Sequence, residues 1–126
     1  MSRVRGGQVG SVSIVVVGIL MVVMVLGLGA ADLARVLIAA SRVQTAADAA
    51  ALAAAQSLAV PGDTDPAVAA GDLVALNGGI LRSCACEAGT FEARVEVETS
   101  VGRLFLSADD LVVSARARAV VDVPTP

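Results

Sequence analysis

The sequence predicts a membrane-held α+β protein, with a long N-terminal helix that crosses a lipid bilayer, followed by a small antiparallel β-meander with one short helix. No charged residue lies between Arg5 and Asp32, and no proline interrupts residues 1–60. Two segments near the C-terminus alternate between apolar and charged residues. We therefore divide the chain into a basic segment (1–11), a transmembrane helix (12–31), an alanine-rich continuation of that helix (32–59) and an α+β domain (60–126).

The run VSIVVVGILMVVMVLGLGAA, residues 12–31, is long enough to span a membrane. At about 1.5 Å per residue it extends about 30 Å, which matches the hydrocarbon core of a bilayer. A helix is expected because the backbone must satisfy its own hydrogen bonds in lipid. Arg3 and Arg5 precede the run, whereas the charges that follow it balance. This asymmetry predicts a single-pass plasma-membrane protein with a cytoplasmic N-terminus and an extracytoplasmic C-terminal domain.

A cleaved secretory signal is the alternative interpretation of this run. The small residues Gly-Ala-Ala near Ala31 suit a signal-peptidase site, and cleavage there would release a secreted, soluble binding protein. Apolar cores of signal peptides usually have about 7–15 residues, which is shorter than this run. The length therefore favours a retained anchor.

The helix is expected to continue beyond the membrane to Ala59. Eight of the ten residues from Ala46 to Ala55 are alanine, the best helix former, and VPGDTDP supplies the proline and glycine that end the helix. Apolar residues spaced alternately by three and four form a packing seam of the coiled-coil type: Leu33, Val36, Ala40, Val43, Ala47, Ala50 and Ala54. The seam can cover the protein's own C-terminal domain or pack against helices of other subunits, and the pattern favours neither.

The C-terminal part is predicted to hold one short helix and several strands. The helix spans 67–76, between Pro66 and the Asn-Gly-Gly stop at 77–79. ILRSCAC, FEARVEVET and VVSARARAVVDV are the expected strands, the last two with strict alternation. Antiparallel pairing would set the arginines of the last strand opposite the glutamates of the preceding one. VGRLFLSADD fits either a strand or a loop with one helical turn.

The composition argues against an enzyme. The chain has no histidine, the commonest general base and metal ligand. The acidic residues of GDTDP and SADD lack the spacing of a calcium loop, and no phosphate loop or nucleophile motif is present. We therefore predict no catalytic, cofactor-binding or metal-ligating residue, no cofactor and no small-molecule substrate. The net charge of −3 also argues against nucleic acid as a partner.

Cys84 and Cys86 are the one reactive-looking pair. Alternate residues of a strand have Cα atoms about 6.6 Å apart, near the upper limit for a disulfide. A bond within the pair, a disulfide between subunits and two small buried thiols are all compatible with the sequence, and an extracytoplasmic location would permit oxidation.

The residues that open the chain resemble a known family. GSVSIVVV at the start of the apolar run, followed by ARVLIAASRVQTAADAAALAAAQSL, is similar to the N-terminal region of TadE/TadG-like proteins of the tight-adherence (Flp) pilus. NGGILRSC and SARARAVV resemble the short actinobacterial TadE-like members. The likeness is strong over 10–59 and looser over 74–121.

The resemblance implies a pilin-like accessory protein, either a minor pilin or an assembly factor, of a Tad/Flp-type pilus or secretion system. Its implied partners are the membrane, other pilin-like or Tad assembly subunits, and a prepilin peptidase that would cut between Gly10 and Ser11. Pilins of this kind usually carry glutamate five residues after the cut. The present chain departs from that pattern with Val15.

Overall fold

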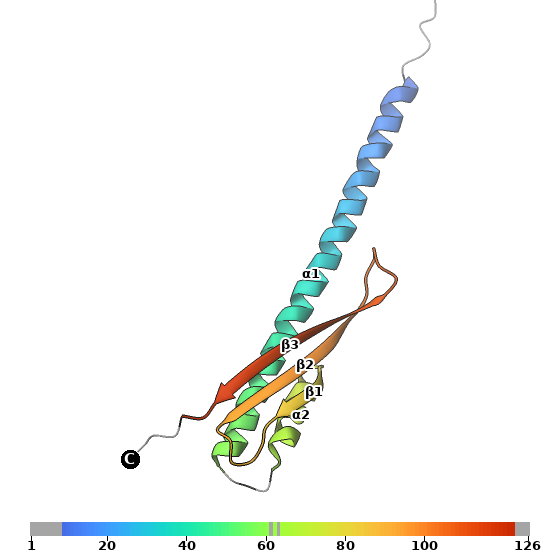
Figure 1. The fold of residues 1–126 in the computed structure, drawn as a ribbon. Coiled ribbons are helices and arrows are strands. Elements are labelled where there is room, and N and C mark those ends of the chain that lie inside the picture. The colour runs from blue at the N-terminus through green and yellow to red at the C-terminus, as the bar shows by residue number, and fades with distance from the viewer. Residues whose placement is uncertain (1–8, 61, 63, 123–126) are drawn as a thin grey trace, which may run out of the picture.

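One long helix and a small sheet make up the structure, a computed structural model that describes residues 9–60, 62 and 64–122 (Figure 1). The elements are α1 (Val9–Ala59), α2 (Pro66–Leu76), β1 (Ile80–Ala85), β2 (Glu92–Arg103) and β3 (Asp110–Val120). The N-terminal half of α1 extends alone, whereas its C-terminal half packs against the other elements (Figure 1). This arrangement confirms the predicted fold class. The basic residues Arg3 and Arg5 lie outside the described residues.

Capping residues set the limits of α2. The Asp65 carboxylate accepts hydrogen bonds from the backbone N–H groups of Ala67 (2.7 Å) and Val68 (3.4 Å), which the first turn of a helix cannot satisfy by itself. Asn77 caps the other end, and Gly78 then turns the chain with φ of 73°. Glycine adopts this left-handed conformation without steric cost, so the chain reverses directly into β1.

The sheet is an antiparallel meander in the order β1-β2-β3. Strand β2 pairs with β3 from Glu92↔Val120 to Arg103↔Asp110, with an irregularity between Ser100 and Gly102. Strand β1 is shorter, so the far half of the β2–β3 hairpin continues without it along α1 (Figure 1). The segment of ambiguous prediction, 101–110, thus contributes to both strands and to the loop between them.

The core lies between this sheet and the two helices. Helix α1 contacts β2, β3 and α2, while α2 also contacts β1. The sheet buries one apolar face, and the alternation of a half-buried strand places the charged residues on the opposite face. Helix α1 contributes seven of the buried core residues, all between Val43 and Ala55; the sheet and α2 contribute Ala70, Val74, Ala93, Val95, Val97 and Ala115.

Candidate functional site on helix α1

The N-terminal half of α1 presents bare apolar side chains. Between Val12 and Leu26 the large apolar residues are 49–75% exposed, and none of the most apolar window of the helix is buried within the protein. Helix α1 is long and apolar enough to cross a membrane. Val15 is 58% exposed in this stretch, and Gly10 and Ser11 lie in the first turn of the helix.

The alanine run is enclosed on most of its circumference. Six of its eight alanines are at most 3% exposed: Ala46, Ala47, Ala50, Ala51, Ala54 and Ala55. The residues that face solvent, Asp48, Leu52 and Gln56, follow a spacing of four and so form one narrow line along the helix. A helix that packs against both a sheet and a second helix needs short side chains on both faces, which allow the backbones to approach closely.

The predicted packing seam divides into two parts. Val43, Ala47, Ala50 and Ala54 are buried in the protein's own core. Nearer the apolar stretch of α1, Val36 is half-buried, whereas Leu33 and Ala40 are exposed. Leu37 and Ile38 are also exposed, by 60% and 53%. The turns of α1 that follow the apolar stretch therefore carry an apolar surface that the described residues leave uncovered.

A buried carboxylate joins α1 to the tip of the β2–β3 hairpin. Asp32 is 7% exposed, and its two carboxylate oxygens accept hydrogen bonds from the backbone N–H groups of Phe105 and Leu106, each 2.9 Å long. These two hydrogen bonds stabilise the carboxylate in its buried position. The tip thus attaches to the helix at the end of the apolar run.

Arg35 makes further contacts with the hairpin tip, one turn along α1. Its guanidinium carbon lies 4.6 Å from the centre of the Phe105 ring, a cation–π geometry, and its Nη1 donates to the backbone carbonyl of Arg103 at 3.4 Å. Sequence reasoning missed both Asp32 and Arg35. Their position just after an uncharged run was a visible signal, but it did not identify partners some seventy residues away.

An open groove of about 460 Å³ lies on the same side of α1. Arg35, Ile38 and Arg42 line it from the helix, and Thr99 and Ser100 from the irregular part of β2. The residues that line the groove include two arginines but no Asp, Glu, Cys or His. Within the described residues, no cluster of three or more Cys, Asp or Glu side chains could hold a metal ion.

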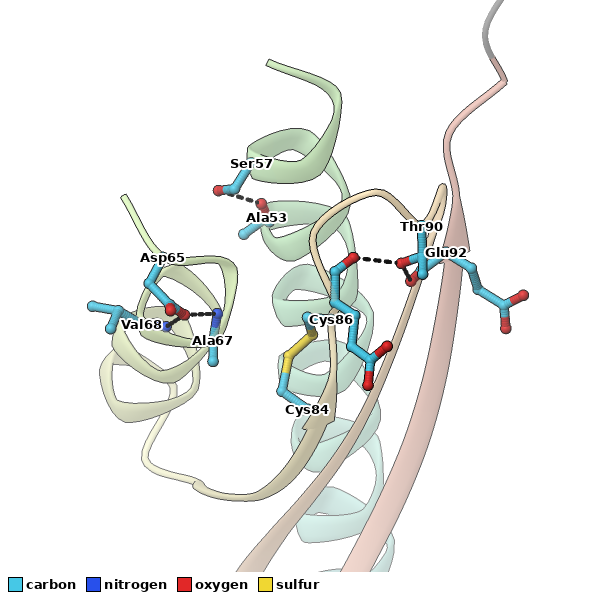
Figure 2. Close-up of a disulfide and its surroundings, with 10 residues drawn as sticks. Ala53, Ser57, Asp65, Ala67, Val68, Cys84, Cys86, Thr90 and Glu92 are labelled. Atoms are coloured by element: carbon cyan, nitrogen blue, oxygen red, sulfur yellow. Dashed lines mark hydrogen bonds between the residues drawn. A yellow bond between two sulfur atoms is a disulfide. The ribbon is translucent and has the colours of Figure 1, made fainter. Parts of the chain in front are cut away.

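Cys84 and Cys86 form a disulfide at the end of β1, with Cα atoms 5.4 Å apart. Figure 2 shows the bond at the point where the strand leaves the sheet, near α1. Both half-buried residues pack against the core cluster. In the turn that follows, the Thr90 hydroxyl donates to the carbonyl of Glu87 (2.7 Å). The pair occupies a structural position beside the core.

Ion pairs cover the outer face of the sheet. Arg116 pairs with Glu96 directly opposite it at 3.0 Å, which confirms the predicted cross-strand arrangement. Arg118 approaches Glu92 at 2.8 Å, and Arg82 pairs with Glu98. The hydrogen bond from Arg118 holds the pKa of Glu92 below its ordinary value of 4.5, and that from Arg82 does the same for Glu98.

These depressed pKa values predict a loss of stability in acid. A carboxylate whose pKa is lower in the folded state stabilises the fold above its unfolded pKa, and the contribution disappears as pH falls through the folded pKa. We expect the unfolding temperature of the full chain in detergent to decrease as pH drops below about 4.5. Glu98→Gln should weaken this dependence, because it removes one of the carboxylates whose pKa is lowered. Equal pH profiles for wild type and Glu98→Gln would contradict the assignment.

A comparison with known protein families finds a match for the N-terminal part of the chain. A family model described as "Putative Flp pilus-assembly TadE/G-like" matches residues 10–57, which is nearly all of α1. No curated protein and no solved structure matched the chain. The match covers the exposed apolar stretch, Asp32 and the alanine run together, and it supports a pilus-related role. Over residues 10–57, the chain is therefore similar to the TadE/G-like proteins of Flp pilus assembly.

Proposed function

We propose that the chain is a non-enzymatic, pilin-like accessory subunit, a minor pilin or an assembly factor, of a Tad/Flp-type pilus or secretion system. Residues 12–31 of α1 anchor it in the plasma membrane, with the N-terminus in the cytoplasm and residues 32–126 outside. The observation that supports this best is that the family match over 10–57 includes an apolar window of α1 that the described residues leave unburied. Exposed side chains of this kind are stable in lipid and costly in water.

The membrane-proximal surface of α1 is the proposed contact with other pilus subunits. Leu33 and Leu37 are 59% and 60% exposed and lie four residues apart, on one face of the helix. Helices that meet in or near a membrane associate by close side-chain packing. The C-terminal part of the seam, from Val43 to Ala54, is buried in the chain's own core. In this conformation it is not available to a partner.

Site-specific photo-crosslinking in cells that assemble the pilus tests the proposal. A photoreactive residue at Leu33 or Leu37 should give adducts with other Tad/Flp subunits, in membranes that retain the full-length chain after alkaline carbonate washing. The same residue at Gln56, exposed at the far end of α1, is the matched control and should give roughly tenfold less adduct.

Two results would contradict the proposal separately. Release of a fragment beginning near Asp32 into the medium would contradict the membrane anchor. It would support the alternative, a secreted binding protein. Retention in the membrane without adducts at either leucine would exclude the assembly surface. Mass analysis of the mature N-terminus shows in the same sample whether a peptidase cuts between Gly10 and Ser11.

A further inference from the structure

We infer that the tip of the β2–β3 hairpin, residues 104–106, is a second membrane contact that lies in the headgroup region of the outer leaflet beside α1. The inference rests on the proposed function in one respect, namely that α1 spans the bilayer. It adds that the extracytoplasmic domain touches the lipid surface through a particular loop.

The hairpin tip is fixed at the depth where the apolar stretch of α1 ends. Phe105 and Leu106 bond through their backbone to Asp32, and the Leu106 side chain approaches Gly29, within 3.5 Å of the position that a Cβ atom there would take. Asp32 follows Leu26, the last of the consecutive exposed apolar residues, by six positions, or about 9 Å along the helix axis. The contacts therefore hold the loop at the edge of the hydrocarbon core.

The side chains of the tip suit that location. Phe105 and Leu106 are 58% and 59% exposed, although their backbone N–H groups are bonded to Asp32 of α1. Phenylalanine and leucine are residues with which peripheral elements enter the boundary between headgroups and acyl chains. Because the Leu106 side chain lies against Gly29 of α1, a bilayer around the helix would also reach this loop.

The charges near the tip match a lipid surface as well. Asp32 is 7% exposed and each of its carboxylate oxygens accepts a backbone hydrogen bond, so little of this negative group faces lipid. Arg35 lies against Phe105, and Arg103 is exposed beside it. Arginines beside an apolar wedge can bind lipid phosphates while their aliphatic stems cover apolar surface. Asp109 and Asp110, also exposed, lie on the side of the loop that leads into β3.

The absence of tryptophan from the chain provides a direct test. Phe105→Trp introduces a single fluorophore, and Phe91→Trp is a matched control because Phe91 has nearly the same exposure, 57%, at the opposite end of the hairpin. Ile19→Trp reports on the anchor itself. Each full-length variant is reconstituted into phosphatidylcholine–phosphatidylglycerol vesicles that contain lipids brominated either near the headgroup end or near the methyl end of the acyl chains.

The expected result is strong quenching of Phe105→Trp by shallow bromine, at least about twofold greater than quenching by deep bromine or that of Phe91→Trp. Ile19→Trp should be quenched by deep bromine. If Ile19→Trp is unquenched, the anchor fails and the proposed function with it. If Ile19→Trp is quenched but Phe105→Trp behaves like Phe91→Trp, the lipid contact alone is overturned. A blue shift of Phe105→Trp that depends on protein density, without bromine quenching, would assign the tip to a second copy of the chain and also overturn the inference.

Discussion

Ala50→Leu is expected to lower the free energy of unfolding by about 2–3 kcal/mol, the cost of overpacking a tightly packed core. Ala50 is 0% exposed, and its neighbours one turn away, Ala46, Ala47 and Ala54, are equally enclosed. A longer side chain must displace the sheet or α2, because α1 contacts both. For a domain of this size the unfolding temperature should fall by roughly 10–20 °C, measured by circular dichroism on the full chain in detergent.

Ala40→Leu is the matched control for this experiment. Ala40 lies on the same helix and in the same predicted seam, but it is exposed, so the added carbons can extend away from the described core. We expect its effect on the unfolding temperature to be small, since surface substitutions usually change stability by about 0.5 kcal/mol or less. If both variants melt alike, close packing of the alanine run is not what stabilises the domain.

The sequence predicted the fold class because its strongest signals are local. The uncharged run, the alanine-rich segment and the strict alternation of FEARVEVET each determine an element from neighbouring residues alone. The alternation also predicted which face of the sheet is charged, and the pair Arg116–Glu96 confirms it. These patterns reflect the repeat of apolar and polar residues along each element, which is the same whatever the element packs against.

The packing around α1 was less accessible to prediction. Spacings of three and four describe one stripe on a helix, whereas Ala46, Ala51 and Ala55 lie outside the seam and are as buried as Ala47. Helix α2 and the sheet together cover more of α1 than a single stripe. In an alanine-rich helix all faces are alike in sequence, so the pattern does not show which faces are covered. The contact with two elements, the sheet and α2, is seen only in the structure.

The Asp32 contact could not be predicted at all. Its partners are backbone N–H groups 73 and 74 residues away, and a backbone amide has no residue-specific signature. The loop that supplies them belongs to VGRLFLSADD, the segment whose conformation the sequence left open. Asp32 is the first charged residue after the uncharged run, but only the tertiary structure shows what its carboxylate binds.

Removal of the Asp32 carboxylate should free the hairpin tip from α1. Hydrogen bonds to a charged group contribute about 1.5–3 kcal/mol each, and Asp32→Ala loses two. If about 2–3 kcal/mol of the local opening free energy disappears, amide hydrogen exchange at Phe105 and Leu106 should become roughly 30- to 150-fold faster. Asp32→Asn keeps one carbonyl acceptor and should give an intermediate rate. Exchange in the middle of β2, at Val95, should change little because that part of the sheet is held by its own ladder.

The control for the loss of a carboxylate on α1 is Asp48→Ala. Asp48 is exposed and accepts a hydrogen bond from the Gln44 side chain, one turn away at 3.0 Å, so its removal should leave exchange at the tip unchanged.

Combined with Phe105→Trp in vesicles, Asp32→Ala also separates two ways of holding the tip in place. If the carboxylate alone sets its depth, the preference for shallow bromine should disappear with Asp32. Persistence of that preference would mean that lipid retains the loop even without Asp32. Unchanged exchange at Phe105 and Leu106 in Asp32→Ala would show that the carboxylate does not clamp the hairpin, and the structural basis for the depth of the tip would be lost.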